Sequence, residues 1–553
     1  MCGIAGMFDK SSDLRQQEEI FIEMRDALSR RGPDQNGILI DNPVALIHTR
    51  LSVVDLENGK QPMTFSRGNE TYSILYNGEL YNTSELKLEL TALGHRFLSR
   101  SDTEVLLHAY VEWKDDCVDK LNGIFAFAVW EKHSERLFFA RDRIGVKPFF
   151  YSLKDGRFIF ASEIKALLKH PSIHAEIDSD SVAEIMLIGP GRTPSCGVFC
   201  GIDELKPAHC GYYSKSGLQI RRYWKMLAHK HTDSFEQTAE RVRFLVTDAI
   251  TRQLVSDVPV GTFLSGGLDS SIISSVANRK FKEENLPLTT FSVDYLDNQK
   301  YFSSGKFQPS DDRKYIDLMT EYLGAENKRV LLDTDELVSA LYTAAEARDL
   351  PGMADVDSSL LLFCKEIKKS VTVALSGECA DEIFGGYPWY RDPAIREKDG
   401  FPWSQSTAYR ASFLRPEFAK KIDATEFVET RYRGALADCD IPEDDTDDEK
   451  RMKQLVNLNL NWFMQTLLDR KDRMSMYSGL EVRVPFCDYR IAEYLYSVPW
   501  EMKDYKNQEK GLLRYAMRGI LPDEVLYRKK SPYPKTHNPA YLNAVRGILR
   551  NII

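Results

Sequence analysis

Short apolar and aromatic runs separated by turn-forming residues characterise the first part of the chain. Such runs lie at Gly123–Trp130, Leu137–Ala140 and Phe149–Tyr151. The last run is joined through Lys154-Asp155-Gly156 to apolar residues 158–160, and Asp-Gly between two apolar runs predicts a β-hairpin. Apolar positions at helical spacing predict a helix over Asp102–Trp113, with Asp102 as its candidate cap. We therefore expect mainly antiparallel sheet with a few helices.

In the second half, strand-length apolar runs alternate with helix-length amphipathic segments. Strands are predicted over residues 259–264, 288–293, 329–332 and 371–375. Helices are predicted over residues 238–254, 269–278, 312–323 and 337–348. This alternation requires crossover connections, so it predicts a parallel sheet covered on both faces. From about Phe401 the pattern is mostly helical, with an acidic run over Asp438–Glu449 that we expect to be a solvated loop.

A polar, Gly-rich and His-rich stretch separates these two patterns. The length of 553 residues allows two to four domains of ordinary size. We expect a first domain over residues 2–205, a linker over 206–234 and a second domain over 235–540. The longest obvious apolar run, Ile124–Trp130, has the length of a strand, so no membrane span is expected.

Composition and charge narrow the functional classes. The 73 Lys and Arg against 82 Asp and Glu leave a net charge of −9, which argues against a general nucleic-acid binder. The first residues lack the basic and apolar regions of a secretory signal. Nine cysteines without a metal-like cluster suit free thiols in a reducing cytosol.

One cysteine, Cys2, directly follows the initiator methionine. Removal of Met1 would leave a residue with both a thiol and a free α-amine. Because the ordinary pKa of an α-amine is about 7.7–8.0, this amine can take the thiol proton without a histidine. On position alone, a small buried hydrophobe near a chain end is the more common interpretation.

Polar segments beside the apolar runs favour the interpretation of Cys2 as a nucleophile. They lie at residues 31–34, 48–52, 77–82 and 101–104. Arg50 can hold a carboxylate through two hydrogen bonds, and Glu79 and Asp102 can accept hydrogen bonds from an ammonium group. Asn77 and the backbone N–H of Gly78 can form an oxyanion hole. Each segment alone could be turn chemistry, but together with Cys2 they indicate hydrolysis of a glutamine side chain.

A glycine loop, Leu264 to Ser271, follows a predicted strand and opens a predicted helix. Its two glycines allow close approach of the backbone, and the helix N-terminus attracts phosphate. The loop matches neither a Walker P-loop nor a dinucleotide fingerprint. The pattern Ser-Gly-Gly-x-Asp-Ser at residues 265–270 would occur by chance in a chain of this length with a probability on the order of 10⁻³. We expect a different phosphate-binding loop.

A second loop, residues 376–387, follows another predicted strand. Parallel strands gather their carboxyl ends on one side, so Asp381 and Asp269 are candidate magnesium ligands. The alternative interpretation is an acid-capped helix start. Late cations, Lys510, Arg514 and residues 528–530, are either polyphosphate contacts or ordinary surface charges.

Residues 1 to about 205 resemble the class II glutamine amidotransferase domain, an N-terminal-nucleophile hydrolase with a four-layer αββα sandwich. The resemblance implies that Cys2 attacks the glutamine amide and that Asn77 and Gly78 form the oxyanion hole. It also implies that glutamine is held by Arg50, Glu79 and Asp102. The chain departs from many members at Arg30, where histidine is common. Because the implied base is the Cys2 amine, this departure should not abolish the chemistry.

With both later loops included, the chain from Cys2 to about Asn538 resembles the glutamine-hydrolysing asparagine synthetases. The resemblance implies a doubly wound, parallel-sheet ATP-pyrophosphatase domain. There Mg-ATP would activate the side-chain carboxylate of aspartate as an acyl-adenylate and release pyrophosphate. Ammonia, carried in the family through an internal tunnel, would then displace AMP.

The resemblance also implies positions for the second site. It places adenine against Leu264 and Val293, and magnesium at Asp269 and Asp381. The phosphate contacts implied are Ser265, Gly266, Gly267, Asp269, Ser270, Ser376, Gly377 and Lys530. Glu378 is the candidate base for the attacking ammonia.

Some features leave the acceptor open. The chain has Cys-Ala at 379–380 where Gly-Ser is common, Cys487 where Leu is usual and Tyr533 where Phe is frequent. Spacing alone does not assign Asp355 or Asp357 to aspartate recognition. Amidation of another carboxylate, such as a cell-wall peptide acid, is therefore the alternative.

Two further alternatives are less favoured. The intact Cys2 and Arg50 argue against β-lactam closure, which does not use glutamine. A non-catalytic regulator predicts damage to Cys2, the glycine loop or Glu378, and none is seen. We expect glutamine, aspartate and ATP as partners, Mg²⁺ as cofactor, no nucleic acid or membrane, a homodimer, and a cytoplasmic location.

Overall fold

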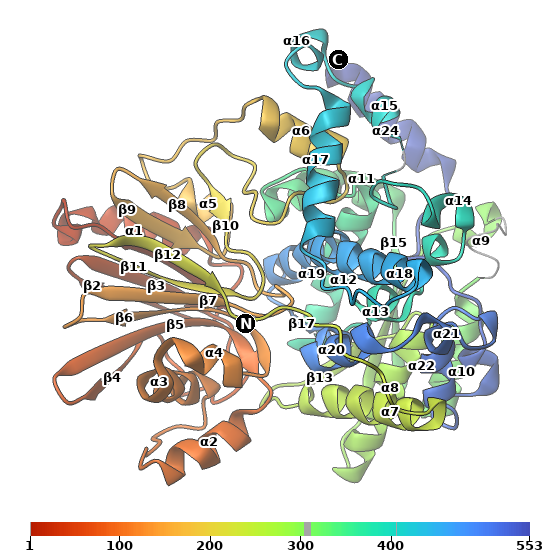
Figure 1. The fold of residues 1–553 in the computed structure, drawn as a ribbon, viewed down its shortest axis with the longest axis horizontal. Helices are drawn as coiled ribbons and strands as arrows, with labels where there is room; N and C mark the ends of the chain where they lie inside the picture. The colour runs from red at the N-terminus through yellow and green to blue at the C-terminus, as the bar shows by residue number, and fades with distance from the viewer. Residues whose placement is uncertain (1, 303–310, 405, 553) are drawn as a thin grey trace. The chain divides into compact units, whose positions relative to one another are not determined.

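The chain forms two compact units of mixed α/β structure in the computed structural model (Figure 1). The structure describes residues 2–302, 311–404 and 406–552, so Met1 lies outside the described residues. Within these ranges the first unit comprises residues up to 226 together with 398–439 and 457–469, and the second comprises the rest. Among the described helices, none combines the length and the apolar character needed to cross a bilayer. The expected fold class is confirmed.

Two antiparallel six-stranded sheets form the centre of the first unit. The first sheet has the order β10-β8-β9-β1-β3-β2 and the second has the order β12-β11-β7-β6-β5-β4. The strands of the first sheet are β1 (Cys2–Phe8), β2 (Gln35–Asp41), β3 (Val44–Arg50), β8 (Phe150–Lys154), β9 (Arg157–Ala161) and β10 (Asp203–Glu204). Those of the second are β4 (Met63–Arg67), β5 (Glu70–Leu80), β6 (Gly123–Glu131), β7 (Arg136–Arg141), β11 (His209–Ser214) and β12 (Gly217–Arg222).

Helices contact both sheets, which gives the four layers expected from the resemblance. Helices α1 (Glu18–Ala27) and α5 (Ile164–Leu167) contact strands of the first sheet, and α3 (Asp102–Trp113) contacts β4 and β5 of the second. Other helices of this unit include α2 (Thr83–Ala92), α4 (Cys117–Lys120), α6 (Ser179–Leu187), α15 (Thr407–Ala411), α16 (Pro416–Ala419) and α17 (Ala424–Ala437).

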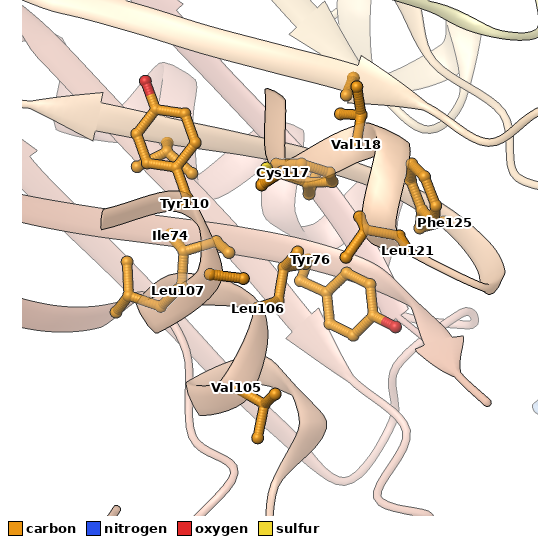
Figure 2. Close-up of a cluster of buried hydrophobic side chains, with 14 of the residues drawn as sticks. Ile74, Tyr76, Val105, Leu106, Leu107, Tyr110, Cys117, Val118, Leu121 and Phe125 are labelled. Carbon is orange, nitrogen blue, oxygen red and sulfur yellow. The ribbon is translucent and has the colours of Figure 1, made fainter. Parts of the chain in front are cut away.

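Strand β6 shows why the central apolar run has no polar positions. Its residues alternate between two buried clusters, because successive side chains point to opposite faces of a sheet. Phe125, Phe127 and Val129 pack in a cluster that includes side chains of α3. Figure 2 shows Phe125 of this cluster with Val105, Leu106 and Tyr110 of α3. Ala126 and Trp130 pack between the two sheets. The strand is therefore buried on both faces.

The predicted hairpin at Lys154–Gly156 is confirmed. Strands β8 and β9 pair antiparallel with Lys154 opposite Arg157. Asp155 and Gly156 both have positive φ angles, 53° and 73°, as the tight turn requires. The predicted helix over Asp102–Trp113 is also confirmed, but its cap is Ser101, whose side chain accepts from the N–H of Thr103. Asp102 is thus not the cap.

The linker expected over residues 206–234 is shorter in the structure. Strands β11 and β12 form a hairpin, and β11 pairs with β7 in the second sheet. The irregular connection begins at Tyr223. The single domain expected over 235–540 also differs, because residues 398–439 and 457–469 belong to the first unit. Long-range apolar packing, as between Leu187 of α6 and Tyr432 of α17, causes this difference.

The acidic run at Asp438–Glu449 is only partly a loop. Helix α18 (Asp447–Leu458) begins inside it, with three acidic residues in the first turn, where the helix dipole favours them. Asp438 pairs with Arg222 at 2.7 Å, and Asp445 pairs with Lys453 at 2.6 Å.

The second unit contains a five-stranded parallel sheet with the order β15-β14-β13-β16-β17. The strands are β13 (Val260–Phe263), β14 (Thr289–Tyr295), β15 (Glu326–Leu332), β16 (Val373–Leu375) and β17 (Glu481–Arg483). The strand order reverses between β13 and β16, which creates the switch point where ligands bind in such sheets. Both predicted loops follow the strands at this point.

Helices lie at the predicted places before and between these strands: α7 (Phe235–Arg252), α8 (Leu268–Glu283), α10 (Arg313–Leu323) and α11 (Thr334–Arg348). Other helices of this unit include α12 (Asp355–Lys368), α13 (Ala380–Phe384), α20 (Tyr489–Ser497), α22 (Gly511–Ala516) and α24 (Pro539–Ile552). Helix α19 (Met464–Tyr477) begins in the residues of the first unit and ends in those of the second. The alternation of strand and helix that the sequence predicts is confirmed.

We expect Asp142→Asn to destabilise the first unit by about 2–4 kcal/mol. The buried Asp142 carboxylate accepts backbone N–H groups from Phe125, Ile144, Gly145, Val146 and Lys147, at 2.7–3.2 Å. An amide would place N–H hydrogens against some of these donors. Hydrogen exchange of residues 123–141 in urea measures the effect.

The exposed Asp26→Asn serves as the control for Asp142→Asn. It should change stability by less than about 0.5 kcal/mol, as is usual for surface substitutions. Equal exchange protection in the two variants would contradict a structural role for the Asp142 carboxylate.

Candidate functional sites

Cys2 begins β1 at the edge where the two sheets of the first unit approach each other. It pairs with Arg50 of β3 in the first sheet, and its side chain is buried. Its backbone nitrogen donates to Oδ1 of Asn77, which lies in β5 of the second sheet, at 3.0 Å. The structure therefore brings the candidate nucleophile and the candidate oxyanion donor together from different sheets.

Asn77 is placed within a strand and not in the turn that Asn-Gly alone would favour. It pairs with Ala126 of β6. Its Nδ2 is buried and has no hydrogen-bond partner among the described residues. A buried donor without a partner is rare in a folded protein, so this group is available to an oxygen of a ligand.

Gly78 allows β6 to approach the site closely. A Cβ atom at this position would lie 2.2 Å from the carbonyl oxygen of Ile124 and 2.8 Å from Cα of Phe125. No side chain fits there without displacing β6, so the residue next to Asn77 has to be glycine.

Arg50 is buried with its guanidinium group held by uncharged acceptors. Its Nη1 donates to Oε1 of Gln35 at 2.9 Å and to the carbonyl of Leu56 at 3.0 Å. Its Nη2 donates to the carbonyls of Val54 at 3.1 Å and Asp55 at 2.7 Å. All four terminal N–H groups therefore have acceptors, and a substrate carboxylate must either use Nε or replace one of them.

Asp102 and Glu79, the two carboxylates expected to bind an ammonium group, are both buried, and both are associated with strand β5. Oδ2 of Asp102 accepts from the hydroxyl of Tyr76 at 3.0 Å and from the N–H of Leu80 at 3.1 Å. Glu79 lies between Gly78 and Leu80 in the same strand. Burial, together with the charge of Asp102, raises the pKa of Tyr76 well above its ordinary value, so this hydroxyl stays a donor.

Arg31 is a functional neighbour that sequence reasoning did not assign. Its Nε donates to the carbonyl of Cys2 at 3.1 Å, and its Nη1 pairs with Oε1 of Glu163 at 3.0 Å. Both side chains are almost fully buried. The only signal in the sequence was the polar segment at residues 31–34.

His48 is the histidine of the polar segment that ends at Ser52, and it is unsuited to act as a base. Its Nε2 lies 3.3 Å from the carbonyl of Tyr76. Burial lowers the pKa of His48 to about 3, and the charge of Arg50 acts in the same direction. The ring is therefore neutral and engaged with the backbone, which leaves the α-amine of a processed Cys2 as the candidate base.

The glycine loop of the second unit closes on itself after β13. Oγ of Ser265 lies 3.0 Å from Oγ of Ser270, and the N–H of Gly267 donates to Oγ of Ser265 at 3.3 Å. Gly266 has a φ angle of 67°, and a Cβ there would lie 2.7 Å from Cβ of Tyr315. Gly267 precedes α8 without a capping side chain, so the first turn of the helix can receive an anion.

The loop after β16 lies against the glycine loop. A Cβ on Gly377 would lie 3.0 Å from Cβ of Asp269. Ser376 donates its N–H to the carbonyl of Arg483, which joins the loop to β17. The structure therefore brings the two predicted phosphate segments together at the switch point of the sheet.

Two lysines contact the candidate magnesium ligands, and one of them, Lys510, contacts both. Lys510 contacts Asp269 and lies 2.7 Å from Oδ1 of Asp381, and Lys530 contacts Asp381. Burial opposes ionisation of Asp381, but the charges of both lysines outweigh it and hold its pKa well below the ordinary value. Oδ1 of Asp269 is buried without a hydrogen-bond partner among the residues described.

A third cation, Arg528, lies at the same loop. It pairs with Asp312, its Nη1 is 3.4 Å from the carbonyl of Ser265, and its guanidinium carbon lies 4.0 Å from the ring centre of Tyr315. Of the late cations left open by the sequence, Lys510 and Arg528 thus contact the glycine loop, and Lys530 contacts the second loop at Asp381.

Glu378 pairs with Lys471 at 2.7 Å. Burial opposes ionisation of Glu378, but the charge and hydrogen bond of Lys471 outweigh it, so its pKa lies below the ordinary value. Glu378 is thus a carboxylate at neutral pH, with one oxygen, Oε2, buried and without a hydrogen-bond partner in the described part of the chain. It can accept a proton, although Lys471 reduces its basicity.

Leu264 and Val293, which are expected to contact adenine, lie at neighbouring strands β13 and β14. Leu264 follows β13 and is buried, and its N–H donates to the carbonyl of Phe291 at 2.7 Å. Val293 lies two residues later in β14 and is also buried. Asp357, which spacing could not assign, forms a buried ion pair with Arg348 at 2.8 Å. Asp357 therefore has a structural partner.

Comparison with known proteins identifies the two parts of the chain. The family model described as "Asparagine synthase" matches residues 241–553, and the model described as "Glutamine amidotransferase domain" matches residues 1–224. The chain is 53% identical over 553 residues to asparagine synthetase [glutamine-hydrolyzing] 3 of Bacillus subtilis, covering 100% of this chain and 90% of the relative. It is 33% identical over 591 residues to asparagine synthetase [glutamine-hydrolyzing] 1 of the same organism, with the same coverage.

We expect His48→Gln to reduce the loss of stability on acidification. Because the pKa of folded His48 is about 3 and that of an unfolded histidine about 6.5, the unfolded chain binds a proton that the folded chain does not. Stability should therefore fall as the pH drops below about 6.5, by up to about 1.4 kcal/mol per pH unit from this residue. Urea unfolding at about pH 7 and about pH 5 measures the slope.

The control is His133→Gln, at an exposed position. It should keep the acid slope of the unmodified protein, whereas His48→Gln should flatten that slope. If both variants keep the same slope, the neutral state assigned to His48 is wrong.

Proposed function

Because the chain belongs to the asparagine synthase family, we propose that it is a glutamine-dependent asparagine synthetase in which each unit carries one half of the reaction. The first unit would hydrolyse glutamine to glutamate and ammonia. The second would convert aspartate and ATP to an acyl-adenylate and pyrophosphate, and ammonia would complete the amide. The observation that carries the proposal is that one chain combines the Cys2–Asn77 pair with the phosphate loops at a strand switch point.

In the first half-reaction, the thiol of Cys2 attacks the side-chain carbonyl of glutamine. The α-amine exposed by removal of Met1 takes the thiol proton and passes it to the leaving ammonia. Asn77 serves both groups, because its Oδ1 accepts from the Cys2 nitrogen while its Nδ2 is left for the oxyanion. The N–H of Gly78 is the second donor, and water releases glutamate from the thioester.

The glutamine backbone would be held at its two charged groups. Arg50 would bind the α-carboxylate, and Asp102 and Glu79 would accept hydrogen bonds from the α-ammonium group. Because the four terminal N–H groups of Arg50 already donate to protein oxygens, the α-carboxylate would bind at Nε or replace one of these acceptors. The guanidinium is already positioned, so it would lose little conformational freedom when it binds.

In the second half-reaction, the side-chain carboxylate of aspartate attacks the α-phosphorus of ATP. Pyrophosphate would leave within the glycine loop, where Arg528 supplies positive charge at Ser265, Lys510 supplies it at Asp269, and Lys530 supplies it at Asp381 of the second loop. Leu264 and Val293 would contact adenine, and Ser270, Ser376 and Gly377 would line the phosphates. Ammonia then attacks the acyl carbon, Glu378 accepts the proton, and AMP leaves.

Asp269 and Asp381 would hold Mg²⁺, and Asp381 would exchange a lysine contact for the cation. The cation prefers oxygen ligands and usually combines one or two carboxylates with substrate phosphates, and Oδ1 of Asp269 is a buried carboxylate oxygen without a partner among the described residues. When bound, Mg²⁺ would neutralise charge on the departing pyrophosphate. The homodimer and the cytoplasmic location stay predictions.

We expect the chain to release pyrophosphate when it is given Mg-ATP, glutamine and aspartate, and to stop when EDTA removes the cation. Pyrophosphate and asparagine should form in equal amounts, because each acyl-adenylate gives one of each. If aspartate gives no more pyrophosphate than buffer while another carboxylate does, the acceptor is wrong although the amidation chemistry survives.

We expect Cys2→Ala to lose glutamine-dependent synthesis and to keep synthesis from ammonium chloride, because only the first half-reaction uses the thiol. Asparagine formation with each nitrogen source measures the separation. Cys200→Ala, at an exposed cysteine of the same unit, is the control and should keep both activities. Loss of both activities in Cys2→Ala would contradict the division into two sites.

A further inference from the structure

Arg470 is a buried cation next to the proposed base. It precedes Lys471, the partner of Glu378, and only 6% of its surface is exposed. The charge of Arg470 is among those that lower the pKa of Glu378, which shows that the two side chains are close, but they form no ion pair within 4.0 Å in the described part of the chain. Burial of an uncompensated charge costs several kcal/mol, so the surroundings of this guanidinium identify what it is built to meet.

Other buried arginines of the second unit have carboxylate partners within 4.0 Å. These pairs are Arg348–Asp357, Arg473–Asp349, Arg483–Glu481, Arg514–Glu509 and Arg528–Asp312. Arg470 is buried to a similar degree but has no carboxylate partner among residues 2–302, 311–404 and 406–552. Among the described buried arginines of the second unit, Arg470 is thus the exception, because the others each pair with a carboxylate.

The contacts that Arg470 does make are weak. Its Nη1 lies 3.5 Å from the sulfur of Met353, and its guanidinium carbon lies 5.7 Å from the ring centre of Tyr533. Its Nε is buried with no hydrogen-bond partner in the described ranges. A thioether is a poor acceptor and an aromatic face is only a partial counter-charge, so an N–H of Arg470 is left for a ligand and no carboxylate of the described residues pairs directly with its charge.

The surroundings of Arg470 indicate that its ligand is a carboxylate of the acceptor and not a phosphate of ATP. The two proposed phosphate loops already have three cations of their own, Lys510 and Arg528 at the glycine loop and Lys530 at Asp381 of the second loop. Lys471, the cation beside Arg470, is occupied by Glu378 at 2.7 Å. Glu378 must lie near the acyl carbon of the acceptor if it takes the proton of the attacking ammonia. In a four-carbon dicarboxylic amino acid, the unreacted carboxylate lies only a few bonds from that carbon.

We propose that Arg470 binds the α-carboxylate of the acceptor amino acid and thereby selects aspartate over carboxylic acids that lack this group. The inference rests on the proposed function and names a specificity residue for its second site. A planar guanidinium matches a carboxylate through two parallel hydrogen bonds. An acceptor without the α-carboxylate leaves Arg470 buried and unpaired, which is the energetic basis of the selection.

The test compares two acceptors in Arg470→Gln. Aspartate carries the α-carboxylate, and β-alanine is the same molecule without it. With ammonium chloride as nitrogen source, pyrophosphate release gives kcat/KM for each, and β-alanine is measured as a competitive inhibitor where its turnover is too slow. We expect kcat/KM for aspartate to fall by about 10²-fold or more, while the constant for β-alanine changes by less than about threefold. The KM for ATP should not change.

Two further variants separate recognition from folding. Arg470→Lys keeps the positive charge but loses the two parallel N–H groups of the guanidinium. Its preference for aspartate over β-alanine should therefore lie between those of the unmodified protein and Arg470→Gln. Arg518→Gln removes an exposed guanidinium that lies 4.1 Å from the ring centre of Tyr515, and it should match the unmodified protein. Glutamine hydrolysis by the first unit should persist in every variant and reports intact protein.

The outcomes separate this inference from the proposed function. If the unmodified protein releases no pyrophosphate with aspartate, the proposed function fails. If it does, and Arg470→Gln and Arg470→Lys lower the constants for aspartate and β-alanine equally, the inference is overturned. An equal fall with a raised KM for ATP would assign Arg470 to a phosphate instead.

Discussion

The requirement that a buried charge be compensated organises both candidate sites. In the second unit, Lys510 lies between Asp269 and Asp381, so two carboxylates and a cation share one buried place. The two arginines at the proposed substrate sites, Arg50 and Arg470, lack carboxylate partners among the described residues. A protein with net charge −9 has many carboxylates to spare, so their absence at these two positions is informative. Each exception lies where a substrate carboxylate is proposed to bind.

The regular elements were predictable because each depends on a local pattern. The strand–helix alternation of the second unit and the hairpin at Asp155-Gly156 follow from periodicity and turn chemistry. The return of residues 398–439 and 457–469 to the first unit was not predictable, because it depends on packing between helices far apart in sequence. The start of the linker was missed for a similar reason, since only pairing with β7 shows that residues 209–214 are a sheet strand.

The candidate sites were predictable as far as chemistry is written in motifs. Cys2, Asn77 and the two phosphate loops stand out in the sequence, and the structure brings each set together. The partners of these residues were not predictable. Lys471 for Glu378 and Arg31 for Cys2 are ordinary cations in the sequence, and only the fold shows which cations are buried beside which acids. The cap of α3 was misassigned by one residue because Ser101 and Asp102 are both good caps.

The strand order of the second unit also bears on how the protein is made. Strand β13 pairs with β16, where Val260 lies opposite Val373, and the cations of the phosphate loop come from Lys510 and later. The two sheets of the first unit, in contrast, are complete by Arg222. Contacts between distant residues form slowly because a long loop must close first. During synthesis on the ribosome, the sheets around Cys2 can therefore assemble well before the loops and cations that are proposed to hold a nucleotide come together.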